Sequence, residues 1–307
     1  MSNGEDEITE WFRAQRRLRE ADFPIDIGDD MAQVRVGGDG SVFITTDMLL
    51  DGVHFDLKEA TLKQAGYKAM AASLSDCAAM ATEPVAAVVS VAIPKGFGAR
   101  QLKELHSGIV QAGDKYGCAL VGGDITSWKG SEPFAISVAM LSKSAGNKPV
   151  RRSGAKAGDC ICVTGELGGA GYRRHLEFEP RVKEAITIAK MVTINAMIDI
   201  SDGLSSDLNR ICMQSKVGAI VNAEEIPISK QAKKNKEPLE AALNDGEDFE
   251  LLFTVSEKDC QKLLEQWAGP VAITEIGRIT NTGKMEIKMP DGEVSDLQVK
   301  GYDHLKK

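Results

Sequence analysis

The chain has 307 residues, an apolar fraction of 43% and a formal net charge of −8. Its length predicts two domains, and its acidic balance argues against a nucleic-acid partner, which needs a basic surface. The N-terminus lacks an apolar signal core and no run of about 18 apolar residues occurs, so we expect a cytoplasmic protein with no membrane partner.

The first half of the chain alternates helical and strand patterns. Residues 5–20 predict an amphipathic helix with Trp11, Phe12 and Leu18 on its apolar face. A strand is expected to end at Asp47. Further elements are expected as an Ala-rich helix at 61–82, a buried strand at 85–94, a helix at 99–116, and strands at 118–124 and 133–141.

A polar stretch with Gly, Pro and a basic cluster, residues 142–159, is the best candidate for a domain boundary. We therefore expect domains at 1–150 and 151–307. Strands and helices alternate beyond the boundary, which is typical of an α/β or α+β fold. The expected elements lie at 160–164, 181–195, 196–200, 202–214, 218–222, 248–255, 257–267 and 271–276.

The six cysteines are scattered, and no CxxC pair occurs. Cys160 and Cys162 lie in an apolar run that predicts a buried strand. With only four histidines, the chain does not show the ligand spacing of a zinc site. Reduced, buried thiols in a cytosolic protein are expected instead.

Five loops share one pattern, in which Asp follows an apolar run among Gly, Ser or Thr. Each alone is typical of a helix cap or a turn. Together they predict a magnesium site for phosphates, because Mg²⁺ prefers hard oxygen ligands and glycines let backbone N–H groups approach phosphate oxygens. Asp207, one helical turn further on, is interpreted as a surface or capping charge. The loops contain Asp29 and Asp30; Thr45, Thr46 and Asp47; Asp76; Gly122, Gly123 and Asp124; and Asp199, Ser201 and Asp202.

Eight sequence words carry a resemblance to a known family. They are "IGDD", "TTDMLLDGVHF", "GYKAMAASLSDCAAM", "VGGDIT", "RRSGAKAGD", "DISDGLSSDL", "GEDFELLFT" and "KGYDHL". In this order they cover nearly the whole chain, which resembles the thiamine-monophosphate kinases of the aminoimidazole-ribotide-synthetase-like superfamily. No Walker motif, protein-kinase motif or Ser-His-Asp order is present.

The resemblance implies a two-domain, PurM-like α/β fold. The N-terminal halves of two subunits are expected to pair into a barrel at a homodimer interface, with a C-terminal α/β domain beside it. ATP and several Mg²⁺ ions are expected between the halves, and the implied reaction transfers the γ-phosphoryl group of ATP to thiamine monophosphate. The catalytic residues would be Asp47, Asp76, Asp124 and Asp202.

The resemblance also implies roles for individual residues, each with a plainer interpretation. Thr45 and Thr46 suit a strand by propensity alone, Arg152 suits a solvated linker, and Glu247 and Tyr302 suit a turn and a packed C-terminus. The implied metal ligands are Asp30, Thr45, Thr46, Asp47, Asp76, Asp124, Asp199 and Asp202. The implied nucleotide contacts are Gly123, Asp124, Arg152, Ser201 and His106, and the implied contacts to the thiamine phosphate are His54, Glu247 and Tyr302.

Two features depart from the family pattern. The segment 166–173 is shorter than in many members, and His106 stands where an aromatic nucleotide contact, often Tyr, is common. Neither change removes an expected metal ligand.

The acceptor in this reaction is itself a phosphate monoester that is largely dianionic at neutral pH. Direct transfer without a phosphoenzyme is therefore expected, with metals offsetting the repulsion between two polyanions. The alternatives are another ATP-dependent enzyme of the superfamily or a non-catalytic nucleotide or metal sensor on the same fold. ATP turnover that requires thiamine monophosphate separates them.

Overall fold

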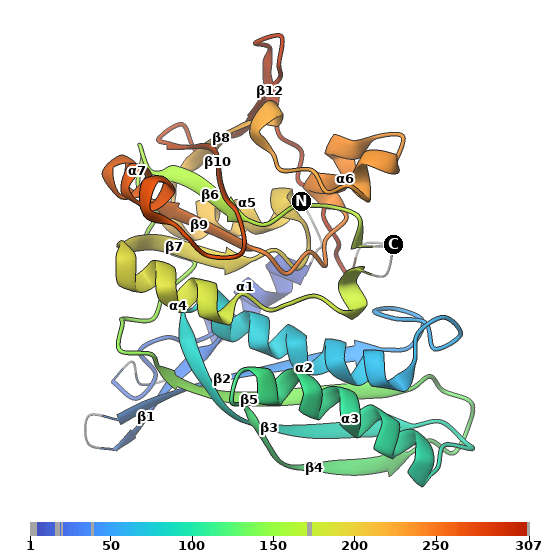
Figure 1. The fold of residues 1–307 in the computed structure, drawn as a ribbon. Coiled ribbons are helices and arrows are strands. Elements are labelled where there is room, and N and C mark those ends of the chain that lie inside the picture. Colours follow the sequence, from blue (N-terminus) through green and yellow to red (C-terminus); the bar gives the residue numbers. More distant parts are fainter. Residues whose placement is uncertain (1–4, 16–18, 20, 38–39, 171–173, 306–307) are drawn as a thin grey trace.

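The computed structural model describes residues 5–15, 19, 21–37, 40–170 and 174–305. Two sheets form the molecule, and a helical layer lies between them (Figure 1). The first sheet has the strand order β1-β2-β5-β3-β4, antiparallel except for the parallel pair β3 and β4. Its elements are β1 (Ala32–Gly37), β2 (Gly40–Leu50), α2 (Leu62–Ala79), β3 (Thr82–Ile93), α3 (Ala99–Lys115), β4 (Ala119–Ser127) and β5 (Ala135–Ser144), preceded by α1 (Glu5–Gln15).

The second sheet has the order β12-β11-β8-β10-β6-β9-β7 and is mixed, since β8 and β11 run parallel. Side chains alternate across it: Cys160 and Cys162 of β6 join the core that reaches the first half, whereas Ile161 and Val163 face a second core. Its elements are β6 (Cys160–Thr164), α4 (Val182–Met191), β7 (Ile194–Asp199), α5 (Leu204–Ser215), β8 (Gly218–Asn222), α6 (Pro238–Asn244), β9 (Leu251–Val255), α7 (Glu257–Gln266), β10 (Ile273–Thr280), β11 (Met285–Lys288) and β12 (Val294–Asp296).

Helix α2 lies at the centre of the molecule. Thr61 caps its N-terminus through a capping box with Gln64, and nearly all its residues beyond the first turn are buried. Small residues where α2 meets α3 permit close packing. A Cβ at Gly108 of α3 would lie 1.8 Å from the backbone oxygen of Lys63 in α2. On its other side, the Tyr67 hydroxyl donates to the backbone oxygen of Phe178 at 3.0 Å. The helix therefore fixes the two halves against each other.

The two faces of the first sheet differ. Helices α2 and α3 lie on one face, and Figure 1 shows no described element against the other. The open face carries Ile44, Met48 and Val88, which are 44%, 63% and 41% exposed. The strand expected to be buried at 85–94 is thus buried on one face only, because its Val88 and Ser90 side of the sheet is uncovered in the single chain.

Many expected elements are confirmed. The β6 and β8 strands occupy the expected residues, and α2, α3, α5 and α7 differ from expectation by a few residues at their ends. The first helix is confirmed over Glu5–Gln15, but Trp11 and Phe12 are each about half exposed; Leu18 lies outside the described residues. The strands β1, β11 and β12 and the helix α6 were not predicted. Within the described residues, no helix combines the length and the apolarity that crossing a membrane requires.

Candidate active site

The acidic loops converge beside the central helix. Asp47 lies on β2, Asp76 on α2, Asp199 at the end of β7, and Asp30 just before β1. Ligand oxygens of Asp30, Asp76 and Asp199 all lie within 4.8 Å of one another. With neighbouring side chains they line a cavity of about 290 Å³. The predicted residues in its lining are Asp30, Thr45, Thr46, Asp47, Asp76, Arg152, Asp199, Ser201 and Asp202.

Hydroxyl groups hold three of these carboxylates in place. Ser73 donates to Asp47 at 2.5 Å, Thr45 donates to Asp76 at 2.5 Å, and Ser75 donates to Asp199 at 2.6 Å. Two of the three donors lie on α2. Helix α2 thus orients the carboxylates of two strands, β2 and β7, and contributes the carboxylate of Asp76 itself.

The acidic cavity contains more negative charge than its neighbours balance. Burial raises the pKa of Asp76 well above its usual value, and the nearby carboxylates of Asp47, Asp199 and Asp30 raise it further. Burial also raises the pKa of Asp199 to about 7, with Asp30 as the next cause, and raises the pKa of Asp47. Such shifts arise where a carboxylate lacks water and a cationic partner.

Two arginines border this cavity. Arg152 donates to Asp30 at 2.6 Å, so it is not a solvated linker charge. Burial still raises the pKa of Asp30 despite this arginine. The second carboxylate oxygen of Asp30, Oδ2, is buried and has no hydrogen-bond partner among the residues that the structure describes. Arg210 of α5 donates to Asp202 at 2.5 Å and to Asp207 at 2.7 Å.

Asp207 confirms the capping alternative of the sequence interpretation and contradicts the surface one. It is fully buried and accepts hydrogen bonds from the backbone N–H groups of Asp202 and Gly203, at 3.1 Å each. Its carboxylate therefore orders the start of α5, the helix that follows the Asp199 loop. Gly203 has a φ of 114°, and a Cβ there would lie 3.1 Å from Asn244, so a residue without a side chain suits this turn.

A second cavity of about 330 Å³ adjoins the acidic one. Asp47, Ser201 and Asp202 line both. The second cavity adds the predicted residues His54, Glu247 and Tyr302. The backbone N–H of Tyr302 donates to the backbone oxygen of Asp202 at 3.0 Å, and this bond brings the C-terminal segment to this cavity.

Glu247 belongs to a loop with two strained residues. Glu247 and Phe249 have φ values of 55° and 50°, a conformation that costs an ordinary residue of order 1–3 kcal/mol. Backbone hydrogen bonds hold this loop. The backbone N–H of Glu247 donates to the backbone oxygen of Ser201 at 2.7 Å, and that of Phe249 donates to the backbone oxygen of Ile200 at 2.8 Å. The loop is thereby fixed to the Asp199–Asp202 segment, with Glu247 in the second cavity.

Lys68 of α2 is a further residue of this cavity that sequence reasoning missed. It is 1% exposed, and its ammonium donates to Glu247, to the backbone oxygen of His54, and to Nδ1 of His175 at 2.7 Å. An ammonium has three N–H donors, so all are used. Burial lowers the pKa of Lys68 and raises that of Glu247, while each opposes the shift of the other.

Both histidines beside Lys68 are neutral. Burial lowers the pKa of His54 and of His175 to about 4, and the Lys68 charge is the next cause for each. Nδ1 of His54 accepts from the backbone N–H of Leu50 at 3.0 Å, so its Nε2 carries the proton. The helical spacing of Lys68, Ala72 and Asp76, four residues apart, is the sequence signal that places Lys68 on the site face of α2.

Three predicted residues lie elsewhere. Gly123, Asp124 and His106 line a separate cavity between α3 and the edge strand β4. Asp124 is exposed in the single chain. Gly123 and Asp124 lie within strand β4 rather than in the expected loop, and the structure does not bring them to the other aspartates within one chain.

The chain matches two family descriptions and many known proteins. Residues 28–143 match "AIR synthase related protein, N-terminal domain" and residues 156–290 match "AIR synthase related protein, C-terminal domain". The chain is 38% identical over 287 residues to the thiamine-monophosphate kinase of Rhodopirellula baltica, covering 89% of this chain and 87% of the relative. It is 32% identical to that of Escherichia coli, covering 97% of both.

Solved structures agree with this similarity. AaThiL complexed with AMPPCP and TMP superimposes with a TM-score of 0.81 at 30% identity, covering 98% of this chain and 97% of that one. Hydrogenase maturation protein HypE in complex with ATP has a TM-score of 0.71 over 87% of both chains, at 16% identity. The second likeness shows a shared fold alone.

Proposed function

The chain belongs to the thiamine-monophosphate kinase family, and from this premise we propose that it transfers the γ-phosphoryl group of ATP to thiamine monophosphate, giving thiamine diphosphate and ADP. One observation supports this most strongly: a carboxylate-lined cavity adjoins a second cavity and shares Asp47, Ser201 and Asp202 with it. Two substrates bound in adjoining cavities can meet at the shared wall. The solved relative AaThiL was complexed with AMPPCP and TMP, an ATP analogue and the proposed acceptor.

We propose Mg²⁺ as the partner of the acidic cavity. Three carboxylates within 4.8 Å of one another, and a buried Asp30 oxygen without a partner, offer the hard oxygen donors that Mg²⁺ prefers. When bound, Mg²⁺ offsets phosphate charge and aligns the reacting groups. The proposed ligands from this chain are Asp30, Thr45, Thr46, Asp47, Asp76, Asp199 and Asp202.

The chain's own groups would position the nucleotide. Arg152 and Arg210 border the cavity and provide fixed positive charge for phosphate oxygens. Ser201 lies between the two cavities, where its hydroxyl can contact a nucleotide phosphate. No general base is needed, because the acceptor oxygen is already ionised at neutral pH, and we propose direct transfer.

The second cavity is proposed to hold the acceptor. Glu247 would accept from the aminopyrimidine, and Tyr302, which is 49% exposed, would cover a ring. Lys68 would hold Glu247 in place through its ammonium and so fix the group that reads the aminopyrimidine. His54 completes the wall as a neutral side chain.

We further propose a homodimer formed through the open face of the first sheet. The apolar run of β3 is typical of a strand buried on both faces, yet Val88 is 41% exposed in the single chain. A second copy packed on this face would cover Ile44, Met48 and Val88 and close the two sheets into a barrel. The proposed domain division at residue 150 keeps this interface within the first domain.

A dimer also gives a role to the distant Asp124. We propose that Gly123, Asp124 and His106 on the α3–β4 edge of one subunit serve the nucleotide bound by the other subunit. ATP as a substrate and six free, buried cysteines suit a cytoplasmic enzyme.

The function is tested by measuring ADP release with thiamine monophosphate, with thiamine, and without an acceptor, in parallel. Mg²⁺-dependent ADP release that requires thiamine monophosphate is expected. ATP binding without acceptor-dependent turnover would favour the non-catalytic alternative. Product analysis by phosphorus NMR then identifies thiamine diphosphate.

Shared sites are tested by mixing two inactive variants, Asp47→Asn and Asp124→Asn. If each site draws Asp124 from the other subunit, random mixed dimers have one intact site each, and about a quarter of the wild-type activity returns. Sites built within one chain give no recovery. Mixing each variant with more of itself is the control.

A further inference from the structure

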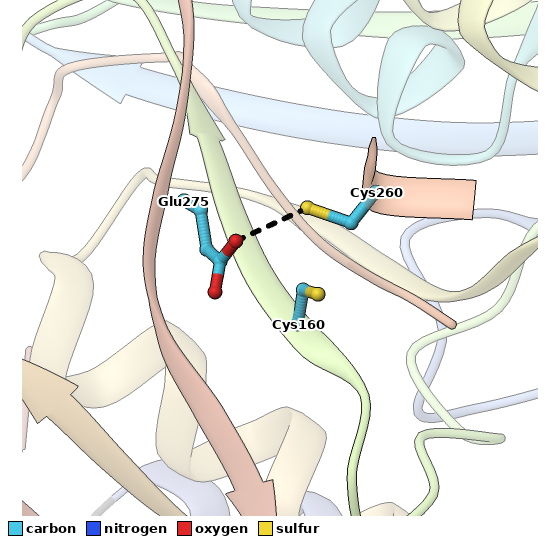
Figure 2. Close-up of side chains that lie close together, drawn as sticks. All are labelled: Cys160, Cys260 and Glu275. Atoms are coloured by element: carbon cyan, nitrogen blue, oxygen red, sulfur yellow. Dashed lines mark hydrogen bonds between the residues drawn. The ribbon is translucent and has the colours of Figure 1, made fainter. Parts of the chain in front are cut away.

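Two cysteines of one strand and a third about a hundred positions away gather on one face of the second sheet, and none of them lines either cavity of the proposed active site. Cys160 and Cys162 come from β6, and Cys260 comes from α7. Glu275 of β10 lies beside Cys160 and Cys260 (Figure 2). Ligand atoms of Cys160, Cys260 and Glu275 lie within 4.8 Å of one another.

We propose that Cys160, Cys260 and Glu275 bind a divalent transition-metal ion of the zinc class, with Cys162 as a fourth donor within reach. This site is independent of the Mg²⁺ chemistry of the kinase. The scattered spacing of the cysteines gave no such expectation, because the ligands come from three separate elements.

The distances within the cluster suit a tetrahedral ion. Two thiolates on one zinc lie about 3.8 Å apart, given Zn–S bonds of about 2.3 Å, and a thiolate and a carboxylate oxygen lie about 3.5 Å apart. Sγ of Cys162 is 3.8 Å from Sγ of Cys260, and Sγ of Cys260 is 3.4 Å from Oε2 of Glu275. Cys260 therefore already lies at ligand-like separations from two donors, and the group that shares mutual distances within 4.8 Å is Cys160, Cys260 and Glu275.

The charges also balance around such an ion. Two thiolates and one carboxylate carry three negative charges, which a divalent cation and one arginine neutralise. Arg278 provides that arginine: its guanidinium contacts Sγ of Cys160 and lies 3.0 Å from Glu275. A guanidinium against a buried thiol sulfur has little to bind when the thiol is neutral, and an anionic thiolate gives it a partner.

An ion can reach the site from solvent. The cysteines are buried, but the side chains of Glu275 and Arg278 are 31% and 37% exposed. On binding, each coordinating thiol releases its proton to solvent. The bound ion would join β6, α7 and β10, so its expected effect is to stabilise the second domain.

The test is a titration of the reduced, full-length protein with Co²⁺ and Cd²⁺ in excess Mg²⁺, which occupies the oxygen-only sites. A thiolate-to-metal charge-transfer band that saturates at one equivalent per chain is expected. Cys260→Ser should abolish the band, and Glu275→Gln should weaken Zn²⁺ competition by about tenfold or more. Cys212→Ser, which removes a buried cysteine outside the cluster, should leave the band unchanged.

Two results would overturn the proposal. One is no band with the reduced wild type, or a band that Cys260→Ser leaves intact. The other is a thiol count, made after denaturation without reductant, that is two below the six free cysteines even when Zn²⁺ is present. That count would mean that two cysteines of the cluster form a disulfide instead of binding the ion. Kinase activity is measured separately, and its presence or absence decides neither outcome.

Discussion

Two groups of buried carboxylates differ in their partners. Glu250 is fully buried and accepts from Arg181 at 2.5 and 2.6 Å, from Arg174 at 3.3 Å, and from the Thr164 hydroxyl at 2.7 Å. Asp30, Asp76 and Asp199 crowd within 4.8 Å of one another, and only Asp30 is paired with an arginine.

This difference separates a structural carboxylate from one poised to receive a cation. A buried charge that is matched by fixed cations contributes to one folded arrangement, and removing one partner is strongly destabilising. Carboxylates that face each other without cations repel when the site is empty, so they cost stability and favour binding of an added cation. The two groups should therefore respond to the same chemical change in opposite ways.

The largest expected effect is on activity at the unpaired cluster. Asp199→Asn keeps the size of the side chain and removes a charge, so we expect kcat/KM to fall by about a thousandfold or more, roughly 4 kcal/mol in the barrier. The melting temperature should hold or rise, because one repelling charge is gone. Steady-state kinetics at saturating Mg²⁺ and a thermal melt without Mg²⁺ check this.

Asp245→Asn is a matched control for that change, because Asp245 lines the second cavity but not the acidic one. It should leave kcat near the wild-type value. An Asp199→Asn variant that turns over normally, or one that loses stability as well as activity, would contradict the proposed division between the two groups.

At the paired carboxylate, the effect should appear in stability instead. Glu250→Gln leaves Arg174 and Arg181 facing a neutral amide in a buried site, which is expected to cost about 3–5 kcal/mol of unfolding free energy. Urea unfolding measures it. Glu257→Gln is the control, because Glu257 is 70% exposed and its arginine partner is on the surface, so its loss should change the unfolding free energy by less than 1 kcal/mol.

The acidic residues could be predicted from the sequence because their signal is local. An apolar run followed by Asp predicts a strand end, which is confirmed for Asp199 at the end of β7; Asp47 reaches the same cavity from inside β2, because that strand continues to Leu50 rather than ending at Asp47 as expected. Asp124 follows the same local pattern but lies on an edge strand of one chain. Its assignment depends on a second copy, which a single sequence does not display.

The burial of Lys68 and of Asp207 could not be predicted, for the opposite reason. Lys68 is one of two lysines in an Ala-rich helix, and a lysine is usually exposed. Its burial depends on the Glu247 loop, 179 positions away in sequence. For Asp207 the capping alternative was correct but its burial was not predicted, because nothing beside it in sequence shows that α5 packs its first turn into the core. Long-range contacts decide both cases.

Lys68 gives an intermediate test, since its pair with Glu247 is structural in form but lies in the second cavity. Lys68→Met fills the same space without the charge and releases Glu247. We expect the KM for thiamine monophosphate to rise by about tenfold, equal to 1.4 kcal/mol, with a smaller change in the KM for ATP. Lys63→Met, on the exposed side of the same helix, should change neither value; equal losses for both substrates would remove Lys68 from the acceptor site.

The smallest expected effect concerns pH and a neutral partner of Lys68. Burial lowers the pKa of His175 from 6.5 to about 4 in the folded chain, so between these values the unfolded chain binds a proton that the folded chain does not. The stability that this histidine contributes is therefore complete above pH 6.5 and is lost as the pH falls toward 4.

The variant His175→Gln cannot bind that proton. Its unfolding free energy should therefore fall less across this range than that of the wild type, by on the order of 1 kcal/mol. Urea unfolding at about pH 7, 6, 5 and 4, which spans this range, measures the difference. His106→Gln, an exposed control, should follow the wild type. Because the raised pKa values of Asp199 and Asp76 act in the opposite direction, only the difference between variant and wild type isolates the histidine. Identical pH profiles for His175→Gln and the wild type would mean that His175 already binds its proton in the folded state, and that Lys68 does not hold it neutral.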